Sequence, residues 1–353
     1  LERALGYLEK AGENALHDGS FREAQALYEQ ARDVGQSLGI DQVSDRAAFW
    51  WKGIGTAHYF LGQMARSREY IEMAVGILDR ALPTGRPSTV ARLLEAIFMQ
   101  FRSQRRRNKT SCDPAVKPTY DLVVDCYKIL GQLYFLEGEP AEQLAYLSLR
   151  GLNVGEYAGS SAALACILTN TSFIASLAGL DRPARWYADR ARTMTESGRE
   201  RAAAAYVWHI DALRHAQHGD WSEALNCNGK AHALMAELGD YTLATEAAAV
   251  RSTLTLCTGD LNAATEAARI ARDAAQEYGN DQYLCWALLD ESEIALAIGN
   301  VEQAERCLML ALEVETDKAD LSSTLDKQHA IAMLRLSQHR YDEAAEAATE
   351  VCR

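Results

Sequence analysis

The sequence has little proline, no long apolar run and no excess of basic residues. Only 6 of its 353 residues are proline, the residue that breaks helices most strongly, so long helices are permitted along nearly the whole chain. No apolar stretch approaches the roughly 20 residues that a membrane-spanning helix needs. The formal net charge of −13 disfavours binding to nucleic acid or to anionic membranes, because phosphate contacts need a basic face.

Motifs of common catalytic sites are also missing. The chain has no GxxxxGK[ST] phosphate loop, no GxSxG turn and no HExxH helix. Its glycines are spaced as helix terminators and never clustered as a phosphate cradle. We therefore predict no catalytic residues, no cofactor and no enzymatic activity for this stretch.

The 8 cysteines are scattered and form no CxxC pair, which predicts reduced thiols in a cytoplasmic protein. Cys166, Cys257 and Cys285 lie within apolar helical stretches and are predicted to be small core residues. Leu1 already lies in an amphipathic pattern and the chain stops within another, so we expect it to be part of a larger protein.

What the sequence does contain is a repeat with a fixed period. A helix-ending position recurs along the chain, and at Gly219, Gly259 and Gly299 it is followed by an apolar residue two places on and then by small or apolar residues at helical spacing. These positions are Gly19, Gly62, Gly138, Gly179, Gly219, Gly259, Gly299 and, with the glycine replaced, His339. From Gly138 onward the spacing is 40 or 41 residues, whereas Gly62 and Gly138 are 76 apart, close to two repeats. We count nine helical pairs or remnants of pairs.

This period predicts an all-α fold, an α-solenoid in which helix–turn–helix units of about 40 residues stack into a right-handed superhelix. Alanines at the equivalent position of each second helix should be the close-contact points within a unit. These are Ala24, Ala224, Ala264, Ala304 and Ala344. At His339 the turn must either tolerate a side chain or avoid a left-handed conformation.

The repeated residues resemble the tetratricopeptide repeat. Gly131, Tyr134 and Gly138 match its first helix, and Phe21, Ala24 and Tyr28 match its second. The departure is length, since tetratricopeptide units run about 34 residues. The resemblance implies that first helices line a concave groove for a protein or peptide partner. Its groove positions fall on Phe49, Lys52, Tyr59, Lys128, Phe135, Phe173, Tyr206, His209 and Trp286.

Two interpretations of these groove residues stay open. Their aromatic side chains would be hot spots for a partner, or the longer helices would bury them between units. The resemblance does not extend to the family's carboxylate clamp, because Thr56 and Gln132 stand where asparagines would be needed.

One segment interrupts the periodicity. Five basic residues, Arg102, Arg105, Arg106, Arg107 and Lys109, precede Pro114 and Pro118. We predict an irregular linker at 103–118 between N-terminal helical pairs at 1–102 and a regular array at 119–353. The basic run is either a contact for nucleic acid or an acidic partner or, as we prefer, a solvated helix end.

A metal site is a weaker alternative. Asp211, His215 and His218 are spaced four and three residues apart, on one face of a helix, and are potential metal ligands. Because Asp211 and His215 fall at core positions of the repeat and no fourth ligand is apparent, we expect hydrogen-bonded core residues and no metal.

A second resemblance is more specific. The segment from Leu147 to Ser161, with those beginning at Leu5 and Gly53, is similar to the C-terminal repeat region of multidomain signalling ATPases. Such proteins often carry an adenylate/guanylate cyclase or kinase domain. The resemblance implies a regulatory, partner-sensing arm of a larger protein. The alternative is a small-molecule (inducer) sensing arm, similar to that of the maltose-regulon transcription activator.

Overall fold

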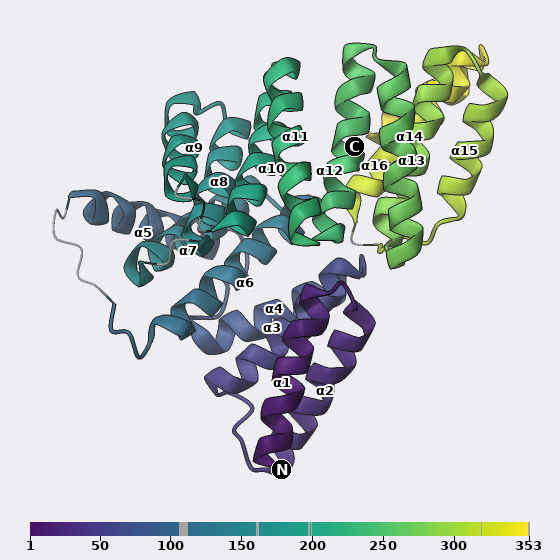
Figure 1. The fold of residues 1–353 in the computed structure, drawn as a ribbon. Coiled ribbons are helices and arrows are strands. Elements are labelled where there is room, and N and C mark those ends of the chain that lie inside the picture. Colours follow the sequence, from purple (N-terminus) through teal and green to yellow (C-terminus); the bar gives the residue numbers. More distant parts are fainter. Residues whose placement is uncertain (106–111, 160–161, 197, 199, 319, 352–353) are drawn as a thin grey trace.

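The computed structural model describes residues 1–105, 112–159, 162–196, 198, 200–318 and 320–351. All regular secondary structure in these ranges is helical (Figure 1). The helices are α1 (Glu2–His17), α2 (Phe21–Ser37), α3 (Asp45–Phe60), α4 (Met64–Leu78), α5 (Arg86–Arg105), α6 (Lys117–Leu136), α7 (Ala141–Ala158), α8 (Ala162–Leu177), α9 (Asp181–Thr195), α10 (Arg201–Gln217), α11 (Trp221–Leu238), α12 (Tyr241–Thr258), α13 (Leu261–Tyr278), α14 (Asp281–Ile298), α15 (Val301–Glu313), α16 (Leu321–Ser337) and α17 (Tyr341–Val351).

The helices form antiparallel pairs around the predicted turn positions, and the prediction of an all-α solenoid is confirmed. Each predicted glycine turn joins two packed helices, for example α10 and α11 at Gly219. Helix α5 belongs to no such pair and packs chiefly on α7. It is the remnant unit that the interval between Gly62 and Gly138 predicts.

The turns are built from a glycine and a capping residue. In the C-terminal array, glycines in left-handed conformation end successive helices at intervals of 20 residues, at Gly239, Gly259, Gly279 and Gly299. The next residue, Asp or Asn, caps the following helix by accepting from a backbone N–H. His339 takes the same left-handed conformation with φ of 60°, so this turn tolerates a side chain.

The predicted close-contact alanines lie in the core. Ala24, Ala224, Ala264 and Ala304 are fully buried, and Ala344, in the last helix, is nearly so. Small side chains at the contact let two helix backbones approach closely.

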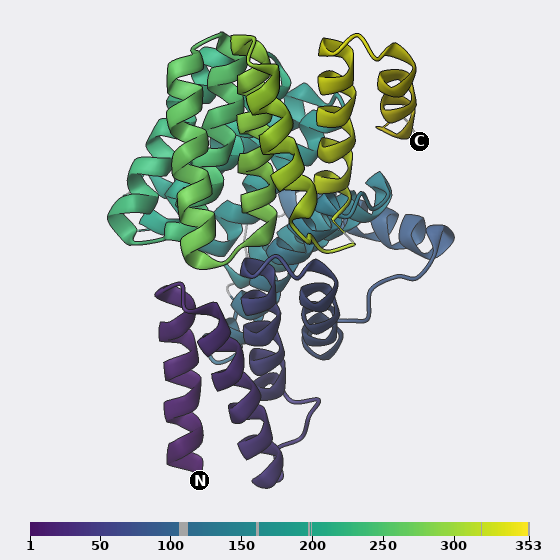
Figure 2. The ribbon, with the colours of Figure 1, turned by 90° about the vertical axis from the view of Figure 1, so that its right-hand side faces the viewer.

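The superhelix curves until its N-terminal units meet its C-terminal ones (Figures 1 and 2). The side-chain amide of Asn280, before α14, donates to the carbonyl oxygen of Phe60 at 2.9 Å. The backbone N–H of Ala65 donates to Asp317 at 3.0 Å. These contacts join turns more than 200 residues apart and close the inner face of the solenoid into a cavity.

Some predictions about individual segments are wrong or lie outside the described residues. Cys166 and Cys285 are buried as predicted, but Cys257, the last residue but one of α12, is exposed. Helix α5 continues to Arg105 and α6 begins at Lys117, while Arg106, Arg107 and Lys109 of the basic run lie outside the described residues. The division into 1–102, 103–118 and 119–353 stays a prediction. No described helix is long and apolar enough to cross a membrane.

Candidate functional site

The inner face of the solenoid holds a cavity of about 210 Å³, which we call the central cavity. It is lined mainly by the first helix of each unit, with aromatic and aliphatic side chains around a few polar ones. The lining residues are Tyr59, Gly131, Gln132, Phe135, Leu136, Ser148, Asn170, Phe173, Ile174, Ile210, Leu213, Glu246, Val250, Gln282, Tyr283, Trp286 and Ser322.

Four of the nine predicted groove residues meet here. Phe135 and Phe173 pack edge to face with ring centroids 5.4 Å apart, and Phe135 keeps 42% of its surface exposed. Trp286 is held in place by its indole N–H, which donates to Ser323 at 2.9 Å. Tyr59 reaches the same cavity from the N-terminal units. The structure thus places these aromatics neither wholly between units nor wholly in solvent.

Among the described residues that line the central cavity, Glu246 alone carries a charged side chain. It accepts a hydrogen bond from the Tyr283 hydroxyl at 3.0 Å and lies 3.2 Å from Nε2 of His209. Burial by itself raises the pKa of Glu246, but His209 and the Tyr283 hydrogen bond outweigh it and hold the pKa below its usual value. A carboxylate is therefore stabilised inside a mostly apolar cavity.

Three further predicted residues, Tyr206, His209 and Lys128, form the wall behind the lining. The Tyr206 hydroxyl donates to Asn170 at 2.8 Å, and the Lys128 ammonium lies 5.3 Å from the centre of the Tyr206 ring. Burial opposes the charge of Lys128, but Cys166, Asp125 and Asp240 together raise its pKa. Tyr206, His209 and Lys128 thus support the cavity without lining it.

The remaining two predicted residues lie elsewhere. Phe49 packs edge to face on Tyr28, with centroids 5.7 Å apart, in the core of the N-terminal units. Lys52 pairs with Asp125 at 3.8 Å. Neither residue lines the central cavity, because α3 presents only its C-terminal end to it.

Sequence reasoning missed Glu246, Tyr283 and Asn170. For Glu246 the signal was available, because Tyr206, Glu246 and Trp286 are successive members of one repeat position, 40 residues apart. An acidic residue between two aromatic residues at one repeat position indicates a polar group on the inner face of the solenoid. Tyr283 and Asn170 carry no comparable signal.

Beyond Trp286, α14 and α16 continue the inner face with acidic residues. Burial and the neighbouring Glu293 raise the pKa of Asp290 to about 8. Burial, with Glu293 and Asp320, raises the pKa of Asp326 to about 6. His329 lies 3.6 Å from Glu293 and opposes the rise in the pKa of Asp326 and of Glu293.

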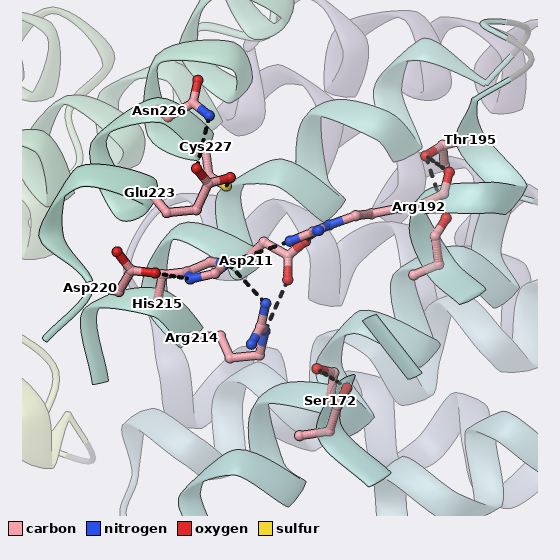
Figure 3. A network of polar contacts seen from close by, with 12 residues as sticks. Ser172, Arg192, Thr195, Asp211, Arg214, His215, Asp220, Glu223, Asn226 and Cys227 are labelled. Atoms are coloured by element: carbon pink, nitrogen blue, oxygen red, sulfur yellow. Dashed lines mark hydrogen bonds and ion pairs between the residues drawn. The ribbon is translucent and has the colours of Figure 1, made fainter. Parts of the chain in front are cut away.

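The alternative metal ligands are engaged by other side chains, and Figure 3 shows this for Asp211 and His215. Asp211 is fully buried and accepts from Arg192 at 2.6 Å and from Arg214 at 3.1 Å. His218 Nε2 lies 2.9 Å from the Ser176 hydroxyl. Asp211 and His218 are therefore engaged by different partners, and the expectation of hydrogen-bonded residues describes both.

His215 instead lies near Glu223 and Cys227, with one ligand atom of each within 4.8 Å of the others. The set fits a metal poorly. Nε2 of His215 faces the Arg214 guanidinium at 3.0 Å, so a cation there would meet a fixed positive charge. Burial, with Asp211 and Glu223, raises the pKa of the Cys227 thiol to about 12, which disfavours the thiolate that metals bind.

Comparisons with known proteins support the fold. No family model matches the chain, and no curated protein matches it in sequence. Among solved structures, a Rap protein complexed with competence and sporulation factor aligns over 100% of this chain and 97% of its own, with 15% identity and a TM-score of 0.54. Aspartyl phosphate phosphatase F from Bacillus subtilis aligns over 98% and 92%, with 12% identity and a TM-score of 0.50. At such identities the likeness establishes a tetratricopeptide-like helical fold alone.

Proposed function

We propose that this chain is a non-catalytic scaffold that binds a protein or peptide segment in the central cavity. The observation that carries the proposal is the convergence of Tyr59, Phe135, Phe173 and Trp286, from four different units, on one cavity. Apolar pockets with a few fixed polar groups are the usual form of binding sites. The similar Rap protein, which was solved with competence and sporulation factor, supports the use of this fold for binding.

The chemistry of the cavity indicates what part of a partner would enter it. Phe135 and Phe173 offer an apolar surface that is partly exposed, and Trp286 is fixed by its hydrogen bond to Ser323. An aliphatic or aromatic side chain of the partner would bury this surface. Large aromatics at the centre of an interface carry much of the binding energy.

Selection from a library of displayed random peptides tests the proposal. Peptides enriched on the wild-type chain should bind Phe135→Ala at least about tenfold more weakly, as expected for a hot-spot residue. Phe135 is partly exposed, so its loss should leave the fold intact. Tyr7→Ala is the matched control, because Tyr7 is a 75% exposed aromatic residue on α1. Peptides that bind Phe135→Ala as tightly as wild type would contradict a site in the cavity.

We further propose that the scaffold is the regulatory arm of a larger cytoplasmic signalling ATPase. Support comes from the resemblance of the segment from Leu147 to Ser161 to the repeat regions of such proteins. The test is the complete coding sequence, which should encode a P-loop ATPase module, with or without a cyclase or kinase domain, on the same polypeptide. A complete sequence without such a module would remove this part of the proposal and leave the binding site standing.

The second candidate function is a small-molecule (inducer) sensing arm of a transcription activator. It is favoured by the small volume of the central cavity, about 210 Å³, and by the single carboxylate in its lining, Glu246. A thermal-shift screen with sugars and nucleotides separates it from the first, because a ligand that binds only the folded state raises the melting temperature.

A further inference from the structure

A second cavity, which we call the outer cavity, lies among α5, α7, α8 and α9 and has a volume of about 360 Å³. Its walls are largely apolar and include Ile97 and Phe101 from α5, Leu149 from α7 and Tyr187 from α9. Ser148 and Ile174 belong to both cavities. The outer cavity is thus a separate space that shares a wall with the central one.

The cavity arises where α5 lacks a partner helix. Helix α5 packs chiefly on α7, and the neighbouring wall contributes the small side chains Ala145, Ala175 and Ala178. Within helical pairs, alanines let two helices meet closely, but here no helix fills the space beside them. The outer cavity is open to solvent at its rim, where Phe101 and Leu180 are exposed. An apolar molecule that filled it would bury this apolar surface.

One polar group in this wall is left without a hydrogen bond. Gln100 is only 5% exposed, and its Oε1 has no hydrogen-bond partner among the described residues. Its Nε2 lies 3.4 Å from a carboxylate oxygen of Glu156. The hydroxyl of Thr171, another lining residue, already donates to Ile167. A buried carbonyl oxygen without a donor is costly, and rotation of the Gln100 side chain toward the cavity would present it to a ligand.

The lining also indicates the charge of the ligand. Among the described residues, the cavity wall contains no charged side chain, and a charged molecule would lose its hydration without gaining a counter-charge. We propose that the outer cavity binds a small, neutral, largely apolar molecule that carries one hydrogen-bond donor, and that Gln100 accepts this hydrogen bond. This proposal does not depend on the function proposed for the central cavity.

Two probe molecules that differ in the donor test the site. 1-Naphthol has a hydroxyl donor on a bicyclic apolar ring, and 1-methoxynaphthalene has the same ring without the donor. In isothermal titration calorimetry, wild-type protein should bind 1-naphthol about tenfold more tightly than it binds 1-methoxynaphthalene, as expected for one buried hydrogen bond. Failure of wild type to bind 1-naphthol, or equal affinity for both probes, would overturn the proposal.

Variants then locate the binding. Gln100→Met keeps the volume of the side chain but removes the carbonyl, so it should bind both probes with similar affinity. Ala178→Leu, at the exposed edge of the outer cavity, should weaken the binding of both probes, because the leucine side chain occupies part of the cavity. Gln132→Met makes the same chemical change in the central cavity and should preserve the wild-type affinities. The outer cavity is not the site if Gln100→Met still binds 1-naphthol more tightly than 1-methoxynaphthalene. The same follows if only Gln132→Met loses that preference.

Discussion

The hydroxyl of Ser292 on α14 donates to the carbonyl oxygen of Ala304 on α15 at 2.9 Å. Ser172 with Ala184 and Ser252 with Ala264 repeat this contact between the helices of other units. A side chain on one helix reaches the backbone of the next only where the facing residue is small. The contact therefore marks the closest approach within each unit.

Ala264→Leu should destabilise the fold by about 1–3 kcal/mol, because Ala264 is fully buried and a larger side chain forces α12 and α13 apart. Urea denaturation measures the change. Thr265→Leu, at the adjacent exposed position of α13, is the control and should have little effect. Equal urea midpoints for Ala264→Leu and wild type would mean that this alanine is not a close-contact point.

Asn280→Ala should lower the free energy of unfolding by about 1 kcal/mol more than Asn300→Ala does. Both side chains cap a helix, by accepting from Tyr283 at 2.9 Å and from Gln303 at 3.1 Å, and loss of a cap costs about 1 kcal/mol. Only Asn280 also donates to Phe60 across the closed superhelix, which adds the worth of one buried hydrogen bond. Denaturant unfolding of the two variants compares them directly. Identical losses would show that the bond to Phe60 contributes nothing to stability.

The sequence predicts the helical pairs better than their arrangement. Gly219, Gly259 and Gly299 reveal units because a helix end is a local event that glycine favours at a fixed interval. The contact between Asn280 and Phe60 is not local, since it depends on small rotations accumulated over six or so units. For the same reason Tyr59 and Trp286 could each be assigned to an inner face, but their meeting at one cavity could not be predicted.

His339→Gly should stabilise the protein by about 1 kcal/mol. His339 has φ of 60°, a left-handed conformation that costs a residue with a Cβ roughly 1–2 kcal/mol, partly offset by the greater freedom of glycine in the unfolded chain. Gly299→Ala, at the equivalent turn with φ of 86°, is the reciprocal control and should destabilise. Thermal unfolding monitors both, and a lower melting temperature for His339→Gly would indicate that the contact of His339 with Tyr341 at 2.9 Å outweighs the backbone strain.

Asp211→Ala should lower the free energy of unfolding by about 3 kcal/mol, more than the other substitutions considered. Its carboxylate is fully buried between Arg192 and Arg214, so its removal leaves two guanidinium groups without their counter-charge. The exposed Asp273, which pairs with Arg269 at 2.9 Å, is the matched control, because ion pairs in solvent contribute little. Similar losses for Asp211→Ala and Asp273→Ala in urea denaturation would contradict a structural role for the buried network.

The acidic inner face of α14 and α16 should make stability depend on pH. Asp290 has a folded pKa of about 8 against an ordinary value of 3.8, so between these values the folded state binds its proton more tightly than the unfolded state does. The free energy of unfolding should therefore fall as pH rises from about 4 to about 8. The asparagine in Asp290→Asn cannot ionise, so this variant should lose less stability over this pH range than wild type does. The difference should be at least ~1 kcal/mol, the equivalent of one pKa unit. Comparison of each protein with itself at pH 5 and pH 9 cancels any packing change from the substitution. Parallel pH profiles for Asp290→Asn and wild type would show that burial does not raise the pKa of this carboxyl, and that this part of the inner face is open to water.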